Sequence, residues 1–185
     1  MRLFIALETP QKVKKEIAVI QKKLRVEKIS GRWIQPKLTH LTLVFLGETA
    51  PNKIGDIEKI LKEASGQIFP INLWLEKIDA FPSPAKAKII HLSLKGELDK
   101  LNALVLKIRK SLKKQKINFD RKLFIPHFTL GRLKKPQNLT WFLSKIKIPR
   151  RKFFVNQLNL IQSTLTPQGP IYKILASFEL KAKNC

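Results

Sequence analysis

The sequence predicts an α+β fold made of two matching lobes, and two observations support this expectation. Apolar runs typical of strands are interleaved with helical patterns, but without the regular strand–helix–strand order of a parallel sheet. Two copies of the pattern His-x-Thr-Leu lie 87 residues apart, at 40–43 and 127–130. No linker or low-complexity tract divides the chain, so we expect a single domain over residues 1–185, built from two interleaved lobes.

In the N-terminal half, the pattern predicts two strand–helix units followed by a pair of antiparallel strands. A threonine and a proline at positions 9 and 10 are typical of a helix start, and apolar residues at helical spacing extend this helix to about Lys28. Pro51 and Gly66 mark the start and the end of the second helix. The expected strands are 2–8, 40–46, 71–78 and 88–95, with a loop containing Gly31 and Pro36 before the second of them and the turn FPSP (81–84) between the last two.

The C-terminal half has a similar order of elements. Apolar residues at helical spacing from Leu98 to Leu112 predict a long amphipathic helix. A basic loop then leads to a strand at 123–130, which contains the second His-x-Thr pattern. A short helix at 139–146 and two strands at 153–162 and 171–180 complete the expected fold.

The charge of the chain indicates a polyanionic partner. Lysine and arginine number 37 against 13 acidic residues, for a formal net charge of +24. Nucleic acid is the commonest partner of so basic a protein, although a lysine-rich solvated surface would give the same count. The lysines are spread from Lys12 to Lys183, which argues against a disordered basic arm.

The sequence also argues against several classes of protein. No apolar run approaches the roughly 20 residues of a membrane span, and the first apolar segment is too short for a signal-peptide core. The only cysteine is Cys185, which rules out an intrachain disulfide and a cysteine metal cluster. We therefore expect a cytoplasmic protein that has no membrane partner and is a monomer.

The two His-x-Thr patterns are the strongest functional signal. With eight threonines among 185 residues, two of the three histidines would carry this spacing by chance on the order of half a percent of the time. In a strand, alternate side chains share a face, so His40 and Thr42 are expected on one surface and His127 and Thr129 on another. The alternative is that both histidines are structural residues, hydrogen-bonded on half-buried strands and without a catalytic role.

A phosphate group suits two such motifs that meet across a cleft. Threonine hydroxyls can donate to its nonbridging oxygens, and imidazoles titrate near neutral pH. A neutral imidazole would accept a proton from an attacking water, while a protonated one would donate to the departing oxygen. This chemistry needs no metal or cofactor, and the sequence contains no carboxylate cluster or HExxH motif. By this reasoning alone the two histidines are interchangeable.

These motifs resemble the 2H phosphoesterases, specifically the bacterial and archaeal RNA 2′,3′-cyclic phosphodiesterases, also called 2′-5′ RNA ligases. The resemblance covers nearly the whole chain. It is carried by MRLFIAL at the start, HLTLVFLGE (40–48), FP (81–82), PHFTLGR (126–132) and LIQSTLTPQGPIY (160–172).

The resemblance implies a bilobal α+β fold with pseudo-twofold symmetry and an active-site groove between the lobes. It implies hydrolysis of RNA 2′,3′-cyclic phosphate ends, tRNA fragments among them, to 2′-phosphates. His40 would donate a proton to the 3′ oxygen, and His127 would accept the proton of the attacking water. Transesterification in the same site would join RNA ends through a 2′-5′ bond.

Other residues are candidates for binding the substrate. Arg132 is a candidate phosphate ligand, although its odd offset from His127 places it on the opposite strand face unless the strand bends at Gly131. Phe81, in an expected loop, and Tyr172 are candidates for stacking on a base. We expect Phe45 in the core, because it shares the face of Leu41 and Leu43, and His91 to be a structural strand histidine.

Two other functions fit the sequence. A noncatalytic basic protein would bind RNA through charge alone. A 2H phosphodiesterase would instead act on 2′-5′ oligoadenylate or on another small cyclic phosphate.

Overall fold

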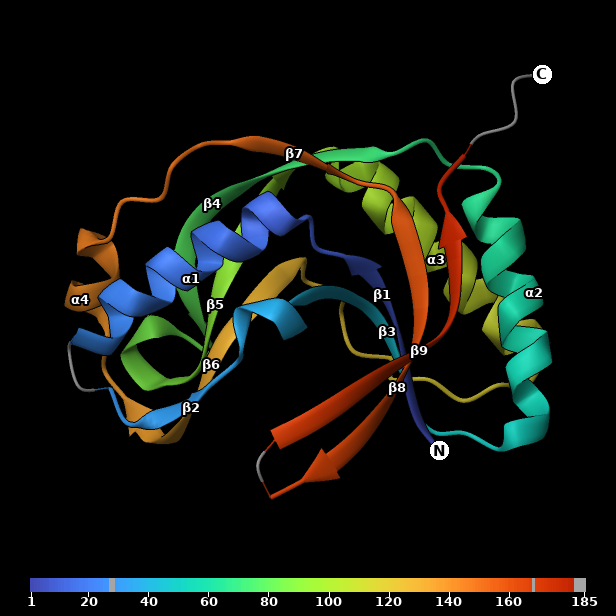
Figure 1. The fold of residues 1–185 in the computed structure, drawn as a ribbon, viewed down its shortest axis with the longest axis horizontal. Coiled ribbons are helices and arrows are strands. Elements are labelled where there is room, and N and C mark those ends of the chain that lie inside the picture. Colours follow the sequence, from blue (N-terminus) through green and yellow to red (C-terminus); the bar gives the residue numbers. More distant parts are fainter. Residues whose placement is uncertain (27–28, 168, 182–185) are drawn as a thin grey trace.

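The computed structural model describes residues 1–26, 29–167 and 169–181, which form two antiparallel sheets (Figure 1). Sheet A has the order β3 (His40–Glu48), β1 (Arg2–Glu8), β8 (Gln157–Thr166) and β9 (Gly169–Glu179). Sheet B has the order β2 (Gly31–Trp33), β6 (His127–Gln137), β5 (Ala87–Gly96), β4 (Ile71–Phe81) and β7 (Lys152–Val155). This arrangement confirms the predicted two-lobed α+β fold.

Helices cover the sheets on the sides of the apolar core. They are α1 (Gln11–Val26), α2 (Ile54–Ser65), α3 (Leu98–Lys114) and the short α4 (Thr140–Lys145), with 3-10 turns at Pro36–Leu38, Pro51–Lys53 and Pro84–Lys86. In Figure 1, α2 and α3 lie side by side next to sheet A, and α1 crosses in front of sheet B. Apolar side chains of α1, α2, α3 and both sheets form one contiguous core cluster.

Two close contacts connect α1 and β2 to β6. Gln21 of α1 is 2% exposed, and its Nε2 donates to the carbonyls of Ile34 (2.7 Å) and Leu130 (2.9 Å). Trp33 of β2 packs so closely on Gly131 that a Cβ at this glycine would lie 2.9 Å from Cε3 of the indole. Glycine at position 131 therefore allows β2 to pair with β6.

Four expected elements differ from the structure. The loop with Gly31 and Pro36 contains β2 and a 3-10 turn, which escaped prediction because each spans only three residues. Phe81 is the last residue of β4, where it pairs with Ile89, and not part of a loop. The strand expected at 123–130 begins only at His127 and continues to Gln137, and the one expected at 153–162 is divided into β7 and β8, which belong to different sheets. The expected helix end at Lys28 and the cysteine Cys185 lie outside the described residues.

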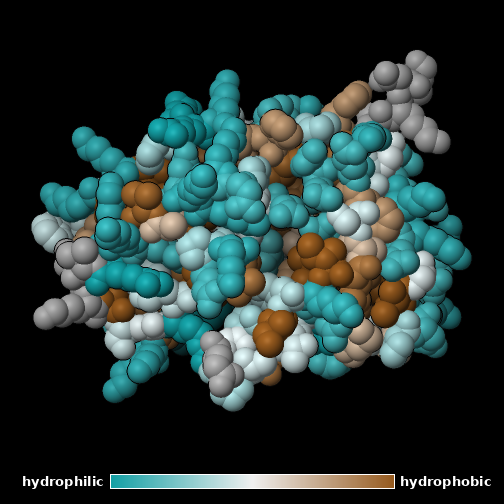
Figure 2. All heavy atoms as spheres, viewed as in Figure 1, coloured by the Kyte–Doolittle hydropathy of each residue, from teal (hydrophilic) through white to brown (hydrophobic). Residues whose placement is uncertain are grey.

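The surface is mostly hydrophilic, as the composition predicts. Figure 2 shows hydrophilic side chains over most of one face, with hydrophobic residues gathered near the point where β3, β8 and β9 meet. No helix in the described part of the chain has the length and apolar character that a membrane crossing requires.

Candidate active site

His40 is the first residue of β3, one of the two edge strands of sheet A. Its Nδ1 lies 2.9 Å from the carbonyl oxygen of Leu38. A carbonyl can only accept, so Nδ1 carries the hydrogen, and the neutral ring has its lone pair on Nε2. The ring packs against two aromatic rings, Phe4 at 4.7 Å between centroids and Tyr172 at 5.1 Å and nearly perpendicular.

His127 has the same local geometry at the start of β6 in sheet B. Its Nδ1 lies 2.7 Å from the carbonyl oxygen of Ile125, again two residues earlier in the chain. Two aromatic rings also pack on this imidazole, Phe81 at 5.0 Å and His91 at 5.2 Å. Each histidine is thus held in one tautomer by a backbone carbonyl, which leaves Nε2 as the nitrogen that can exchange protons.

The two histidines come close because the two sheets meet along β3 and β6. The segment leading into β6 is bonded to β3, since the N–H of Asp120 donates to the carbonyl of Phe45 (2.8 Å). The imidazoles also interact electrostatically, because a positive charge on His127 lowers the pKa of His40. The fold therefore brings together two residues 87 positions apart in the sequence.

Burial keeps both histidines neutral in the free protein at neutral pH. Desolvation lowers the pKa of His40 to about 4, against the raising effect of the Leu38 carbonyl, with further lowering by His127 and Lys14. Desolvation also lowers the pKa of His127, and the nearby positive charge of Arg132 adds to this effect. Two neutral imidazoles can each accept a proton, so donation by either requires an anion that raises its pKa.

The two threonines share the surfaces of their histidines. We call the surface of each sheet that carries its histidine the histidine face. Thr42 and Thr129 are both half-buried and lie two residues after their histidines, separated from them by fully buried residues, Leu41 and Phe128. Neither threonine hydroxyl has a hydrogen bond within the described structure that would occupy it. Both are therefore available to a ligand.

A β-bulge after each threonine changes which residues share this surface. In the β3–β1 pairing, Leu43 is the extra residue, and in the β6–β5 pairing Leu130 is. An extra residue reverses the alternation, so the fifth residue after each histidine returns to the histidine face. Arg132 therefore lies on the same face as His127 and Thr129. The sequence allowed this placement only if the strand departed from regular alternation near Gly131, and the bulge at Leu130 is such a departure.

The same bulge makes the expectation for Phe45 wrong. This side chain is 47% exposed and packs on Phe4 at 6.1 Å between ring centroids, on the histidine face and not in the core. Strict alternation predicted the opposite, because a bulge leaves no signal in the apolar pattern. Phe45 in sheet A and Arg132 in sheet B thus occupy matching positions, each five residues after the histidine of its His-x-Thr motif.

Tyr172 and Phe81 both lie beside a histidine. Tyr172 packs on His40 and on Phe4 (5.3 Å), and burial raises the pKa of its phenol while Arg132 and Arg2 lower it. Arg132, from sheet B, therefore acts on residues of both sheets. Phe81 stacks on His91 at 4.1 Å between ring centroids and is edge-on to His127.

Sequence reasoning missed Phe4 and the contact of His91 with His127. Phe4, Ala6 and Glu8 alternate with buried Leu3, Ile5 and Leu7, so the pattern alone could not say which row faces the histidines. His91 was expected as a structural strand residue, but no signal in the sequence pairs β5 with β6. Among the described residues, no group of three His, Cys, Asp or Glu side chains is arranged to hold a metal ion.

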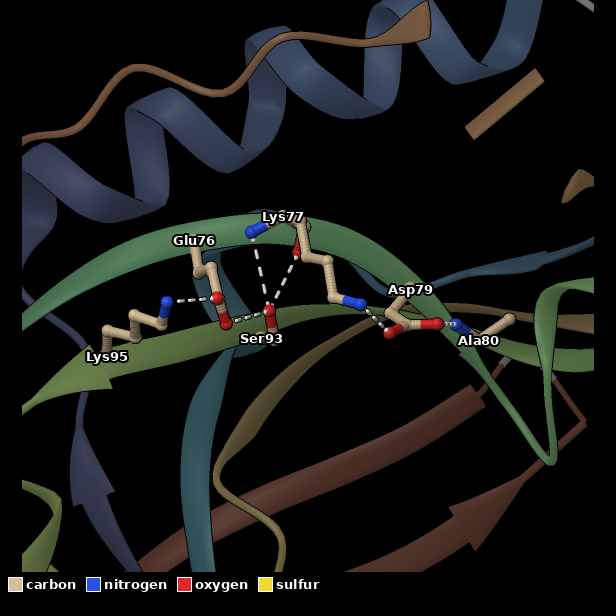
Figure 3. Close-up of polar contacts among 6 residues, drawn as sticks. All are labelled: Glu76, Lys77, Asp79, Ala80, Ser93 and Lys95. Atoms are coloured by element: carbon tan, nitrogen blue, oxygen red, sulfur yellow. Dashed lines mark hydrogen bonds and ion pairs between the residues drawn. The ribbon is translucent and has the colours of Figure 1, made fainter. Parts of the chain in front are cut away.

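A polar network borders the site on sheet B (Figure 3). Ser93 pairs with His127 across β5 and β6, and its Oγ lies 3.1 Å from Oε2 of Glu76 and accepts from the N–H of Lys77 (3.3 Å). Lys95 is 2.8 Å from Glu76 and lowers its pKa. The network holds the irregular part of β4, between Leu75 and Ile78, against β5.

Asp79 continues this network beside His91. Its carboxylate is 2.8 Å from Nζ of Lys77 and accepts the N–H of Ala80 at 2.8 Å. Burial would raise the pKa of Asp79, but these two contacts hold it below its ordinary value. Both carboxylates of the network are therefore ionised and paired with lysines.

Comparison with known sequences connects this arrangement to a family. Residues 7–91 and 93–172 match the family described as LigT like Phosphoesterase. The RNA 2′,3′-cyclic phosphodiesterase of Archaeoglobus fulgidus is 34% identical over 182 residues, which cover 97% of this chain and all of that protein. The protein of the same name from Thermotoga maritima is 33% identical over 178 residues, or 95% of this chain and 93% of that one.

Solved structures share the fold along the whole chain. A Thermus thermophilus protein superposes with a TM-score of 0.84 at 25% identity, with complete coverage of both chains. LigT of E. coli in its apo form superposes with a TM-score of 0.74 at 22% identity over 97% of each chain. These similarities extend over both sheets, so the two-lobed architecture is common to the three proteins.

Proposed function

Because this chain belongs to the LigT-like phosphoesterase family, within the 2H phosphoesterases, we propose that it is an RNA 2′,3′-cyclic phosphodiesterase that works without a metal. The curated relatives carry this name at up to 34% identity over nearly their whole length. The observation that carries the proposal is the pair of imidazoles at the junction of the sheets. Both have Nδ1 fixed by a carbonyl, and the charge of one acts on the other.

In the proposed reaction, the two histidines act on opposite sides of one phosphorus atom. Nε2 of one imidazole takes a proton from water as the water oxygen bonds to phosphorus. The bond from phosphorus to the 3′ oxygen breaks, and the other imidazole gives a proton to that oxygen. The products are a 2′-phosphomonoester and a free 3′ hydroxyl, and the two histidines have exchanged protonation states.

We assign proton donation to His40 and proton acceptance to His127, as the family resemblance implies. Burial lowers the pKa of His40 to about 4, so this residue must gain its proton when the substrate binds. The negative charge of the cyclic phosphate would raise the pKa of an imidazole beside it, so His40 would take up a proton when the substrate binds. His127, with Arg132 nearby, is kept neutral and able to accept a proton.

The remaining residues of the histidine faces would hold the substrate. Thr42 and Thr129 would donate their hydroxyls to the nonbridging phosphate oxygens, and Arg132 would add a charge-assisted contact. Phe81 and Tyr172 remain candidates for contact with a base, and the half-exposed Phe45 joins them. If a 5′ hydroxyl replaces water as the attacking group, the same steps join two RNA ends through a 2′-5′ bond.

We also propose that the enzyme acts as a monomer in the cytoplasm on RNA ends, including those of tRNA fragments. The net charge of +24 suits an RNA polymer, whose backbone carries one negative charge per nucleotide.

The decisive test uses a nucleoside 2′,3′-cyclic phosphate in excess EDTA. We expect the 2′-monophosphate as product, and a loss of at least about a thousandfold in kcat for His40→Ala and for His127→Ala. Lys110→Ala, on the exposed side of α3, serves as the control and should keep full activity. Full turnover in either histidine variant would contradict the two-histidine mechanism.

The same assay separates the other two functions. RNA binding without any turnover would identify a noncatalytic RNA-binding protein. Faster cleavage of 2′-5′ oligoadenylate than of cyclic phosphate ends would identify a different ester as the substrate.

A further inference from the structure

His91 is the most deeply buried of the three histidines, with 3% of its surface exposed. Its Nδ1 is buried and has no hydrogen-bond partner in the part of the chain that the structure describes. An unpaired buried nitrogen destabilises a protein, and an aliphatic side chain would avoid that penalty. The contacts of the ring therefore need an explanation.

The rings of His91, Phe81 and His127 form a cluster in which each ring contacts the other two. The ring of His91 stacks on Phe81, with 4.1 Å between centroids and 22° between planes, and meets His127 at 5.2 Å and 64°. Phe81 itself meets His127 at 5.0 Å and 82°. The imidazole of His127 thus rests on a stacked pair of rings, while its Nδ1 is bonded to the carbonyl of Ile125.

The strand that carries His91 is paired on both sides, with β6 and with β4. His91 lies directly across from Thr129 on β6 and from Asp79 on β4. The network of Figure 3 binds β4 to β5 beside His91 through Ser93, while Asp79 is paired with Lys77 of its own strand. Sheet A has a comparable arrangement, because His40 packs against the rings of Phe4 and Tyr172, which also contact each other.

We propose that His91 is a positioning residue for His127. Stacked on Phe81, its ring holds the His127 imidazole in the orientation that bonds Nδ1 to Ile125 and leaves Nε2 for the reaction, and it shields that imidazole from water. This role rests on the proposed function of His127.

His91 fills this role without adding charge. Burial, together with the charge of the nearby His127, lowers its pKa to about 4, so it is neutral when His127 accepts a proton. A second positive charge at this distance would oppose that protonation. The charged and titratable groups that face the two rings are Lys77 and Asp79 on β4, Arg132 on β6 and His40 on β3.

Three substitutions at position 91 test the proposal. His91→Leu and His91→Gln remove the aromatic ring, and His91→Phe keeps a ring without nitrogens. For the first two we expect kcat to fall about tenfold or more with KM nearly unchanged, and the pKa of His127 to rise toward about 6.5. His91→Phe should keep kcat within about threefold and the wild-type pKa of His127.

The readouts are steady-state kinetics on a nucleoside 2′,3′-cyclic phosphate and an NMR titration of His127 in the free protein. Ile108→Val removes a buried methyl group from α3 and is the control for a general loss of packing, which should change neither readout. Wild-type kcat and pKa in His91→Leu or His91→Gln would overturn the proposal, as would a His91→Phe variant as impaired as they are. The titration needs no substrate, so an inactive wild-type protein would count against the proposed function alone.

Discussion

At the scale of single residues, each of the two histidines has its Nδ1 next to the carbonyl of the residue two positions earlier, but their surroundings differ. His40 packs against Phe4 and Tyr172, and the positive charges of His127 and Lys14 lower its pKa. His127 feels the charge of Arg132. Because both pKa values are lowered, the neutral form of each imidazole is favoured in the free protein at pH 7. In the proposed mechanism, the negative charge of the substrate would complete the acid–base pair.

This dependence predicts that an anion in the site protonates His40. We expect saturating inorganic phosphate to raise the pKa of His40 from about 4 by about two units. An NMR titration of the imidazole with and without phosphate measures the shift. Thr42→Val and Thr129→Val should reduce it, because they remove hydroxyls that we propose as phosphate donors. An unchanged pKa at saturating phosphate would exclude an anion site beside His40.

At the scale of elements, two irregular features determine the composition of the histidine faces. The bulges at Leu43 and Leu130 bring Phe45 and Arg132 to the side of the histidines. The turn after β5 is equally specific. Gly96 has φ +127°, and a Cβ there would lie 2.3 Å from the carbonyl oxygen of Asn72. Gly96 thereby allows the close approach of β5 to β4 at the position where it pairs with Leu73.

Gly96→Ala should therefore destabilise the fold by about 2 kcal/mol or more, through backbone strain and the clash with Asn72. Urea denaturation measures the change in the free energy of unfolding. Gly55→Ala is the matched control, because this glycine lies in α2 with open space around it and alanine should stabilise the helix by about 0.5–1 kcal/mol. Equal effects of the two substitutions would refute the argument from close approach.

At the scale of the whole molecule, both sheets share one apolar core, and hydrophilic residues cover most of the face seen in Figure 2. We propose that residues 1–185 fold as one domain of two interleaved lobes, since α1 is bonded to β6 through Gln21 and α3 contacts β3. The net charge of +24 would then belong to the same domain as the two histidines.

The charge predicts a difference between long and short substrates. Affinity for an RNA oligonucleotide should fall steeply with salt, because each neutralised phosphate releases counterions, whereas turnover of a mononucleotide cyclic phosphate should change much less. Fluorescence anisotropy and kinetics at several salt concentrations measure the two slopes. An equal salt dependence of RNA affinity and of mononucleotide turnover would contradict the hypothesis that the basic surface binds RNA.

The buried histidines also predict a loss of stability in mild acid. In the unfolded chain the pKa of each histidine is about 6.5, but in the fold burial lowers the pKa of His40 and of His91 to about 4. As the pH falls below 6.5 the unfolded state binds protons first, so the folded state loses about 2 kcal/mol per histidine, as an upper value, between pH 7 and pH 5. Above pH 6.5 this contribution is constant. Urea denaturation at several pH values measures the slope.

His91→Phe should remove its own contribution and flatten that slope, while the contributions of His40 and His127 remain. The comparison is restricted to pH above 5, where the carboxylates with lowered pKa values stay ionised. A wild-type stability independent of pH in this range would show that the two histidines are not desolvated in solution.

The sequence by itself determined the α+β class, the main helices and strands and the two His-x-Thr motifs, because these depend on local spacing of apolar residues and on chemistry within a few positions. Only the tertiary structure decided which face Phe45 and Arg132 occupy, that β7 and β8 belong to different sheets, and that His91 touches His127. A bulge shifts the alternation by one residue without any change in hydropathy. Strand pairing depends on contacts between distant segments, which no local pattern encodes.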